Sequence, residues 1–112
     1  MNSKGMKAVN LNTAVDSGLD NDTVLNLSGF FKIFSDATRL KILFALMDKT
    51  LRVSDIADSV GVGSTVASHQ LKTLKDANMI KSERVGKCIY YSIVGCHVRD
   101  IVEMALAHIS EK

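Results

Sequence analysis

Short polar side chains and one cation share a face of the stretch 64–78. Ala67, Leu71 and Leu74 recur at helical spacing, so an α-helix here would turn them toward a core. The opposite face then carries Ser64, Thr65, Ser68, His69 and Lys72. Donors and acceptors near a helix N-terminus, together with an ammonium group, suit contacts with phosphates and base edges in the major groove of DNA. The pattern predicts a DNA-reading helix, and an ordinary amphipathic surface helix is the alternative.

A basic hairpin directly follows this stretch. Residues 79–85 and 88–93 have the composition of two β-strands, and Gly86-Lys87 between them suits a two-residue turn. Between residues 64 and 87, five lysines and arginines outweigh two acidic residues, which gives +3; the whole chain carries +2, so the rest sums to −1. We expect the hairpin to be a wing whose Arg84 and Lys87 contact DNA phosphates beside the helix.

The preceding residues complete a helix-turn-helix. Ser54 is expected to cap a short helix that stops at Gly61-Val62-Gly63, and Ser64 to cap the helix that follows at once. Two short helices joined by a glycine-containing turn are typical of this motif.

Two further helices are predicted upstream. One begins at Asp22 or Thr23 as its cap and runs to about Phe34, and the next is capped by Asp36. The second is expected to place four apolar side chains on a single face: Leu40, Leu43, Phe44 and Met47.

Composition predicts one globular domain with a mainly α fold and a small β-hairpin. The chain has 112 residues, of which 46% are hydrophobic, enough for a compact core. Polar residues 1–21 predict an N-terminal arm, and 22–112 the winged domain. Because no apolar run reaches about 20 residues and no signal peptide is evident, we expect a cytoplasmic protein with no membrane partner.

The end of the chain has apolar residues at helical spacing. They predict a closing helix that starts near Val94 and has about 16 residues. A domain this small gains stability by burying apolar surface against a second copy, so we expect a homodimer. The interface expected on this helix comprises Val98, Ile101, Val102, Ala105 and Leu106.

Four segments together resemble the ArsR/SmtB family of metal-sensing winged helix-turn-helix repressors. They are AspAlaThrArgLeuLysIleLeu (36–43), ValSerAspIleAla (53–57), ThrValAlaSerHisGlnLeuLysThrLeuLysAspAlaAsnMetIle (65–80) and GlyLysCysIleTyrTyrSerIle (86–93). The resemblance covers about residues 22–112. It implies a homodimer that sits on operator DNA until an inducer releases it, with no small-molecule substrate. It does not say which inducer acts, because family members bind metals at different sites.

The family's thiolate site is not matched, because Arg52 and Ser54 stand at its two cysteine positions. The family's other site, on the last helices, has the pattern Asp-x-His, ten residues, then His-x-x-(His or Glu). Here His97, His108 and Glu111 match three of its four ligands, and Gly95 replaces the aspartate. Eleven residues at 100° each put both histidines on one helix face about 16 Å apart, so each site would need ligands from two antiparallel chains.

Nitrogen and oxygen ligands of this kind suit Zn(II), with Co(II) or Ni(II) as alternatives. Water or the Cys96 thiolate would complete the coordination, or the site would be weak or would bind no metal. A different interpretation keeps the DNA binding but senses redox state through Cys88 and Cys96. A metalloenzyme built on the histidines is not supported by any catalytic motif, so we expect no enzyme activity. A winged helix that binds only protein would leave the basic wing unexplained.

Overall fold

A computed structural model describes residues 18–111, which divide into two compact units. The first unit ends at Ser35. Residues 1–17, which make up most of the expected arm, lie outside the described part. The first unit contains helix α1 (Asn21–Ile33). The cap is Asp20, so the prediction of Asp22 or Thr23 was wrong: the Asp20 carboxylate accepts a 2.7 Å hydrogen bond from the Thr23 amide. Hydrogen bonding from Thr23 lowers the pKa of Asp20 below its usual 3.8.

The second unit, which starts at Asp36, holds the predicted helix-turn-helix. Helix α2 (Ala37–Ala45) is capped by Asp36 as expected, through a 2.9 Å hydrogen bond from the Arg39 amide. The expected apolar face was wrong in part, because Phe44 is 42% exposed. The helix ends before Met47, and the residues that it and its C-cap bury are Ile42, Leu43 and Leu46.

Helices α3 (Val53–Val60) and α4 (Ser64–Asp76) are joined at Gly61–Gly63. Their N-caps are Arg52 and Gly63, so the predicted caps Ser54 and Ser64 were wrong, and neither helix has a side-chain cap hydrogen bond. Gly61 ends α3 in the left-handed conformation, with a φ of 75° that favours glycine.

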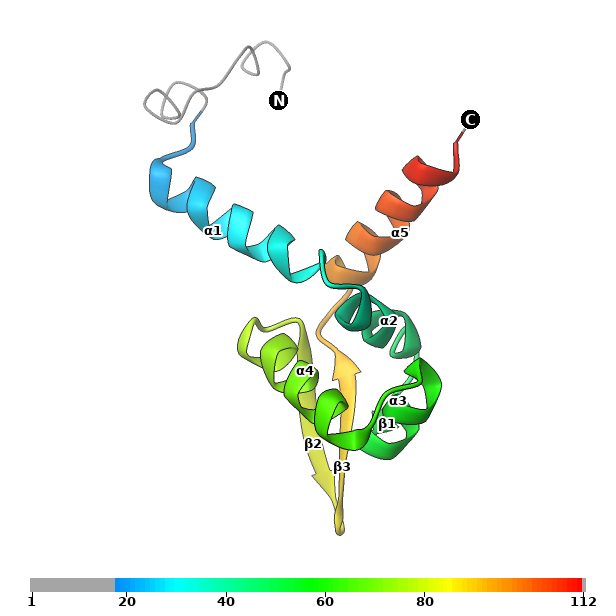
Figure 1. The fold of residues 1–112 in the computed structure, drawn as a ribbon. Coiled ribbons are helices and arrows are strands. Elements are labelled where there is room, and N and C mark those ends of the chain that lie inside the picture. Colours follow the sequence, from blue (N-terminus) through cyan, green and yellow to red (C-terminus); the bar gives the residue numbers. More distant parts are fainter. Residues whose placement is uncertain (1–17, 112) are drawn as a thin grey trace. The chain divides into compact units, whose positions relative to one another are not determined.

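The wing is one part of a three-stranded antiparallel sheet, of which the sequence predicted only two strands. Strands β2 (Ile80–Val85) and β3 (Cys88–Ile93) pair so that Val85 faces Cys88 across the Gly86-Lys87 turn. Gly86 has a φ of 64°, the sign that a type II′ hairpin turn requires at its first loop residue. The short strand β1 (Leu51–Arg52) adds to the other edge of β3, giving the order β1-β3-β2. Within the second unit, the hairpin projects beyond α3 and α4 (Figure 1).

Helix α5 (His97–Ser110) closes the described chain, three residues later than the predicted start near Val94. Gly95 has a φ of 59° and turns the chain between β3 and α5. No helix in residues 18–111 is long and apolar enough to span a membrane. The core of the second unit is formed by α2, α3, the inner face of α4, the base of the wing and the start of α5. The buried residues that α4 and the base of the wing contribute to this core are Ala67, Leu71, Leu74, Met79 and Ile80.

Candidate functional site

The predicted reading face of α4 points away from the core. Ala67, Leu71 and Leu74 are buried, as the spacing predicted. Every polar side chain expected on the opposite face is exposed: Ser64, Thr65, Ser68, His69 and Lys72. Because the first-turn N–H groups have no side-chain cap, they remain available to an external acceptor. This geometry allows α4 to present hydroxyl, imidazole and ammonium groups to a nucleic acid.

The two lysines in the second half of α4 have different partners. Lys72 Nζ lies 3.2 Å from a carboxylate oxygen of Asp76, one turn later on the same exposed face. Lys75 Nζ donates a 2.7 Å hydrogen bond to the hydroxyl of Ser82 on β2. Asp76, Lys75 and Ser82 were not among the site residues predicted from the sequence. The i,i+4 spacing of Lys72 and Asp76 was a usable signal, whereas the contact with Ser82 depends on where the hairpin folds back.

The turn that connects α4 to the wing is held by two backbone hydrogen bonds. Asn78 has a φ of 61°, and its N–H bonds to the Lys75 carbonyl at 2.9 Å. The Met79 N–H bonds to the Leu74 carbonyl at 3.0 Å. Together these bonds form a Schellman motif, in which asparagine takes the place that glycine usually occupies. The base of the wing is therefore fixed to the end of the reading helix.

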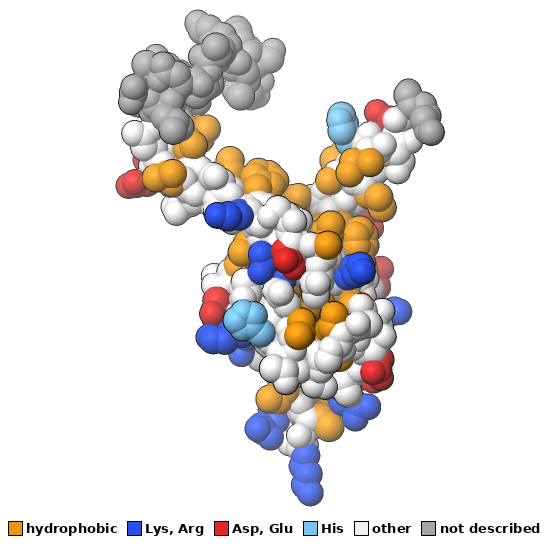
Figure 2. Space-filling model, in the orientation of Figure 1, with side chains coloured by type: hydrophobic (Ala, Val, Ile, Leu, Met, Phe, Trp, Pro, Cys, Tyr) orange, Lys and Arg blue, Asp and Glu red, His pale blue; other side chains and the backbone are white. Residues whose placement is uncertain are grey.

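Basic side chains gather on the projecting hairpin. Arg84 and Lys87 are exposed at its tip, and Lys81 is exposed nearer its base. Figure 2 shows lysine and arginine side chains at and above the tip. The expected wing residues lie on the same unit as α4 and are accessible to an anionic partner.

The three expected metal ligands lie along α5 and its end. His97 is the first residue of the helix, His108 is in its last turn, and Glu111 is its C-cap. All three are exposed. No three His, Cys, Asp or Glu side chains among residues 18–111 come together as a metal site within one chain. The ligand set fits a metal ion only if a second chain completes it, as the spacing already required.

The apolar stripe of α5 is covered at one end and open at the other. Val98 and Val102 are each 5% exposed, so these two expected interface residues belong to the protomer's own core. Ile101 is half-buried, and Ala105 is exposed. Leu106 is 49% exposed and Ile109 77% exposed, further along the same stripe. Ile109 was not among the expected interface residues, although its spacing from Val102 was visible in the sequence.

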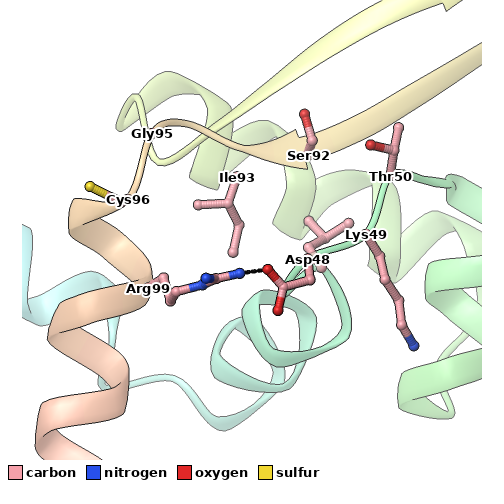
Figure 3. Close-up of a pocket in the computed structure, with 9 residues that line it drawn as sticks. Asp48, Lys49, Thr50, Ser92, Ile93, Gly95, Cys96 and Arg99 are labelled. Carbon is pink, nitrogen blue, oxygen red and sulfur yellow. Dashed lines mark ion pairs between the residues drawn. The ribbon is translucent and has the colours of Figure 1, made fainter.

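A pocket of about 320 Å³ lies where α2, β3 and α5 meet (Figure 3). An ion pair between Arg99 of α5 and Asp48, just beyond α2, crosses it. Asp48 has a φ of 60°, a left-handed conformation that aspartate tolerates better than most residues. The pair ties the start of α5 to the segment between α2 and β1.

The cysteines are separate thiols. Cys88 is half-buried on β3, and Cys96, the N-cap of α5, is exposed. An Arg52 guanidinium nitrogen lies 4.0 Å from the Cys88 sulfur and another lies 3.4 Å from the Asp55 carboxylate. These contacts with Cys88 and Asp55 raise the pKa of Arg52. Arg52, at one of the two positions where the resemblance implies a cysteine of the thiolate site, is thus a cation engaged with its neighbours.

Known proteins are similar to this chain in sequence and in fold. Residues 36–82 match the bacterial regulatory proteins of the arsR family. The cadmium resistance transcriptional regulatory protein CadC of Listeria innocua is 37% identical over 91 residues, covering 80% of this chain and 76% of that protein. The transcriptional repressor SmtB homolog of Synechocystis sp. is 32% identical over 90 residues, covering 80% and 68%. The solution structure of a homodimeric winged helix-turn-helix DNA-binding domain, Mb0332 from Mycobacterium bovis, has a TM-score of 0.73 at 24% identity, covering 93% and 89%.

The helix-turn-helix, the hairpin after it and the polar outer face of α4 define a winged helix-turn-helix DNA-binding regulator. The chain belongs to the arsR family of bacterial regulatory proteins, which confirms the resemblance noted from its motifs. It is a transcriptional regulator and not an enzyme.

Proposed function

We propose that this protein is a cytoplasmic repressor that binds operator DNA as a homodimer and leaves it when an inducer binds. The observation that carries the proposal is the exposed polar face of α4. The opposite side of this helix packs in the core, and its N-terminus has no side-chain cap. The exposed face can enter a major groove, and the basic wing beside it can contact adjacent phosphates. The repressor name of the Synechocystis relative agrees with this role.

The homodimer is supported by the open end of the α5 stripe. Leu106 and Ile109 are large apolar side chains that the protomer leaves uncovered. A symmetric partner would cover both copies at once and would give the operator-binding unit two reading helices. A solved protein with this fold, Mb0332, is homodimeric.

Operator binding is tested with the tightest duplex selected from a random DNA library, measured by fluorescence anisotropy at several salt concentrations. Lys72→Ala and Arg84→Ala should each weaken binding and lower the slope of log K against log salt by about 0.9, because each removes a cation from a phosphate. Glu83→Gln, on the opposite side of β2 from Arg84, is the control and should not weaken binding. If Lys72→Ala and Arg84→Ala both bind as wild type does, the proposed face is wrong.

For the inducer we propose Zn(II) or a similar divalent metal. His97 of one protomer would hold it together with His108 and Glu111 of the partner subunit, giving two symmetric sites in the dimer. Two imidazoles and a carboxylate, all exposed on α5, are a donor set that zinc accepts. The printed name of CadC refers to cadmium resistance, which supports a metal response without naming this chain's metal.

The metal proposal is tested by titrating the operator-bound protein with zinc. About two zinc ions per dimer should bind and lower operator affinity by roughly 1–3 kcal/mol. His108→Ala should abolish this response and leave metal-free binding unchanged, since α5 is separate from α4 and the wing. If zinc leaves operator affinity unchanged, the proposed inducer is wrong.

Gly95→Asp should tighten zinc binding by restoring the family's fourth ligand. The position has room, because nothing lies within 4 Å of an added Cβ, and aspartate is among the residues that accept its φ of 59°. Gly95→Asn has the same backbone preference without the charge, so it is the matched control and should tighten binding less. Equal zinc affinity in the two variants would show that Gly95 is not at the ligand position.

A further inference from the structure

Lys75 differs from Lys72 on the same helix because its exposed ammonium group is hydrogen-bonded to a second element of the protein. Its ammonium group donates to the Ser82 hydroxyl at 2.7 Å, which joins the last turn of α4 to β2. Lys72, one turn earlier, pairs only with Asp76 on its own helix. A lysine that bridges two elements constrains their relative position, whereas a lysine held along its own helix does not.

The bridge lies where the hairpin leaves the core. Met79 and Ile80 at the base of the wing are buried, and the Schellman motif at Asn78 fixes their backbone. Beyond Ile80 the side chains of β2 are exposed or half-buried. On this stretch β3 is paired with β1 on its other edge, at Tyr91 and Leu51, and the Ser82 bond adds a direct link from β2 to α4.

The same bond acts on a wing cation that shares a face of β2 with Ser82. Side chains on a strand alternate between faces, so Ile80, Ser82 and Arg84 share one face of β2. Ile80 is buried, which shows that this face turns toward the body of the unit. Fixing Ser82 against α4 thus fixes the height and direction at which Arg84 leaves the strand.

We infer that Lys75 is a positioning residue that sets the wing against the reading helix and does not bind a phosphate. The inference rests on the proposed function, because the property being positioned is the joint contact of α4 and Arg84 with DNA. Its consequence is specific: the hydroxyl of Ser82, a neutral group, contributes to operator affinity without contributing to its salt dependence.

Ser82→Ala is the decisive variant, because it breaks the bridge and leaves every charge in place. Operator affinity should fall about two- to fivefold, the range for an exposed charged contact, with an unchanged salt slope. Lys75→Met should lower affinity by a similar factor, and the double variant should be no weaker than either single one. Ser82→Thr keeps the hydroxyl and should restore wild-type binding.

A DNA-independent measurement accompanies the binding data. Amide hydrogen exchange in residues 82–90 should accelerate in Ser82→Ala while exchange in α4 stays as in wild type. The inference is overturned if Ser82→Ala binds as tightly as wild type or more tightly. It is equally overturned if Lys75→Met lowers the salt slope by about 0.9, as the loss of a phosphate contact would. Lys72→Ala and Arg84→Ala separate this failure from a failure of the proposed function, because only the latter would leave those two variants unaffected.

Discussion

Replacing Ile109 by glutamate is expected to dissociate the proposed homodimer. Ile109 is 77% exposed in the protomer. Burying a whole isoleucine side chain is worth about 1.5–3 kcal/mol, so covering the exposed part of this one should contribute about 1–2 kcal/mol per protomer. Because Ile109 occurs twice in a two-fold dimer, its loss should weaken association by about 2–4 kcal/mol in total. This corresponds to about a 30- to 1,000-fold rise in the dimer Kd. Burying an unpaired carboxylate adds to the loss.

The assay is sedimentation equilibrium over a wide range of protein concentrations, with circular dichroism to confirm that the variant is folded. Ala107→Glu is the matched control, because Ala107 is exposed and lies about 160° around α5 from Ile109. It should remain dimeric. If Ile109→Glu dimerises as wild type does, or if both variants dissociate equally, the α5 stripe is not the interface.

Three smaller perturbations test individual contacts. Asp76→Asn should raise operator affinity about two- to fivefold at low salt, because it frees Lys72 and removes a carboxylate from the reading face; anisotropy at rising salt should show the gain disappearing. Asn78→Ala should lower the free energy of unfolding by about 1–2 kcal/mol in urea titrations, whereas Asn78→Gly should not, because only alanine is strained at a φ of 61°. The pKa of Asp20 is lowered, so its cap stabilises α1 above pH 3.8, and this contribution is lost as the pH falls through the lowered pKa. The Thr23 amide resonance in an NMR titration should follow that loss. An Asp20→Asn variant should show no such titration.

The sequence predicted those elements whose signals are local. Ala67, Leu71 and Leu74 repeat at helical spacing, and they are buried on α4 as that spacing requires. Gly86-Lys87 has the chemistry of a two-residue hairpin turn, and the strands pair across it. In both cases the information lies within a few residues, so tertiary packing had only to agree with it.

The wrong predictions concern features that neighbours decide. Ser54 and Ser64 are good capping residues, but Arg52 and Gly63 occupy the cap positions, since α3 starts two residues earlier than predicted and α4 one residue earlier. Strand β1 was missed because two residues have no periodicity, and Leu51 becomes a strand only by pairing with Tyr91. The burial of Val98 and Val102 likewise depends on the core against which α5 folds.

The candidate site shows the same division. Residue types and spacing were sufficient to predict that the α4 face is exposed, and the structure places all five of its polar side chains there. The bond between Lys75 and Ser82 could not be predicted, because it joins a helix to a strand through the turn at Asn78. The metal ligands remain a prediction, since spacing alone assigns them to two different chains.

The most direct test of the central claim, that α4 reads the major groove, is methylation interference on the selected operator duplex. Dimethyl sulfate modifies guanine N7 in the major groove and adenine N3 in the minor groove, so it reports which groove the protein needs. If α4 enters the major groove in each half of a two-fold operator, guanine N7 methylation should block binding at two symmetric positions about one helical turn apart. Specific binding that is insensitive to guanine N7 methylation throughout the protected duplex would contradict the central claim.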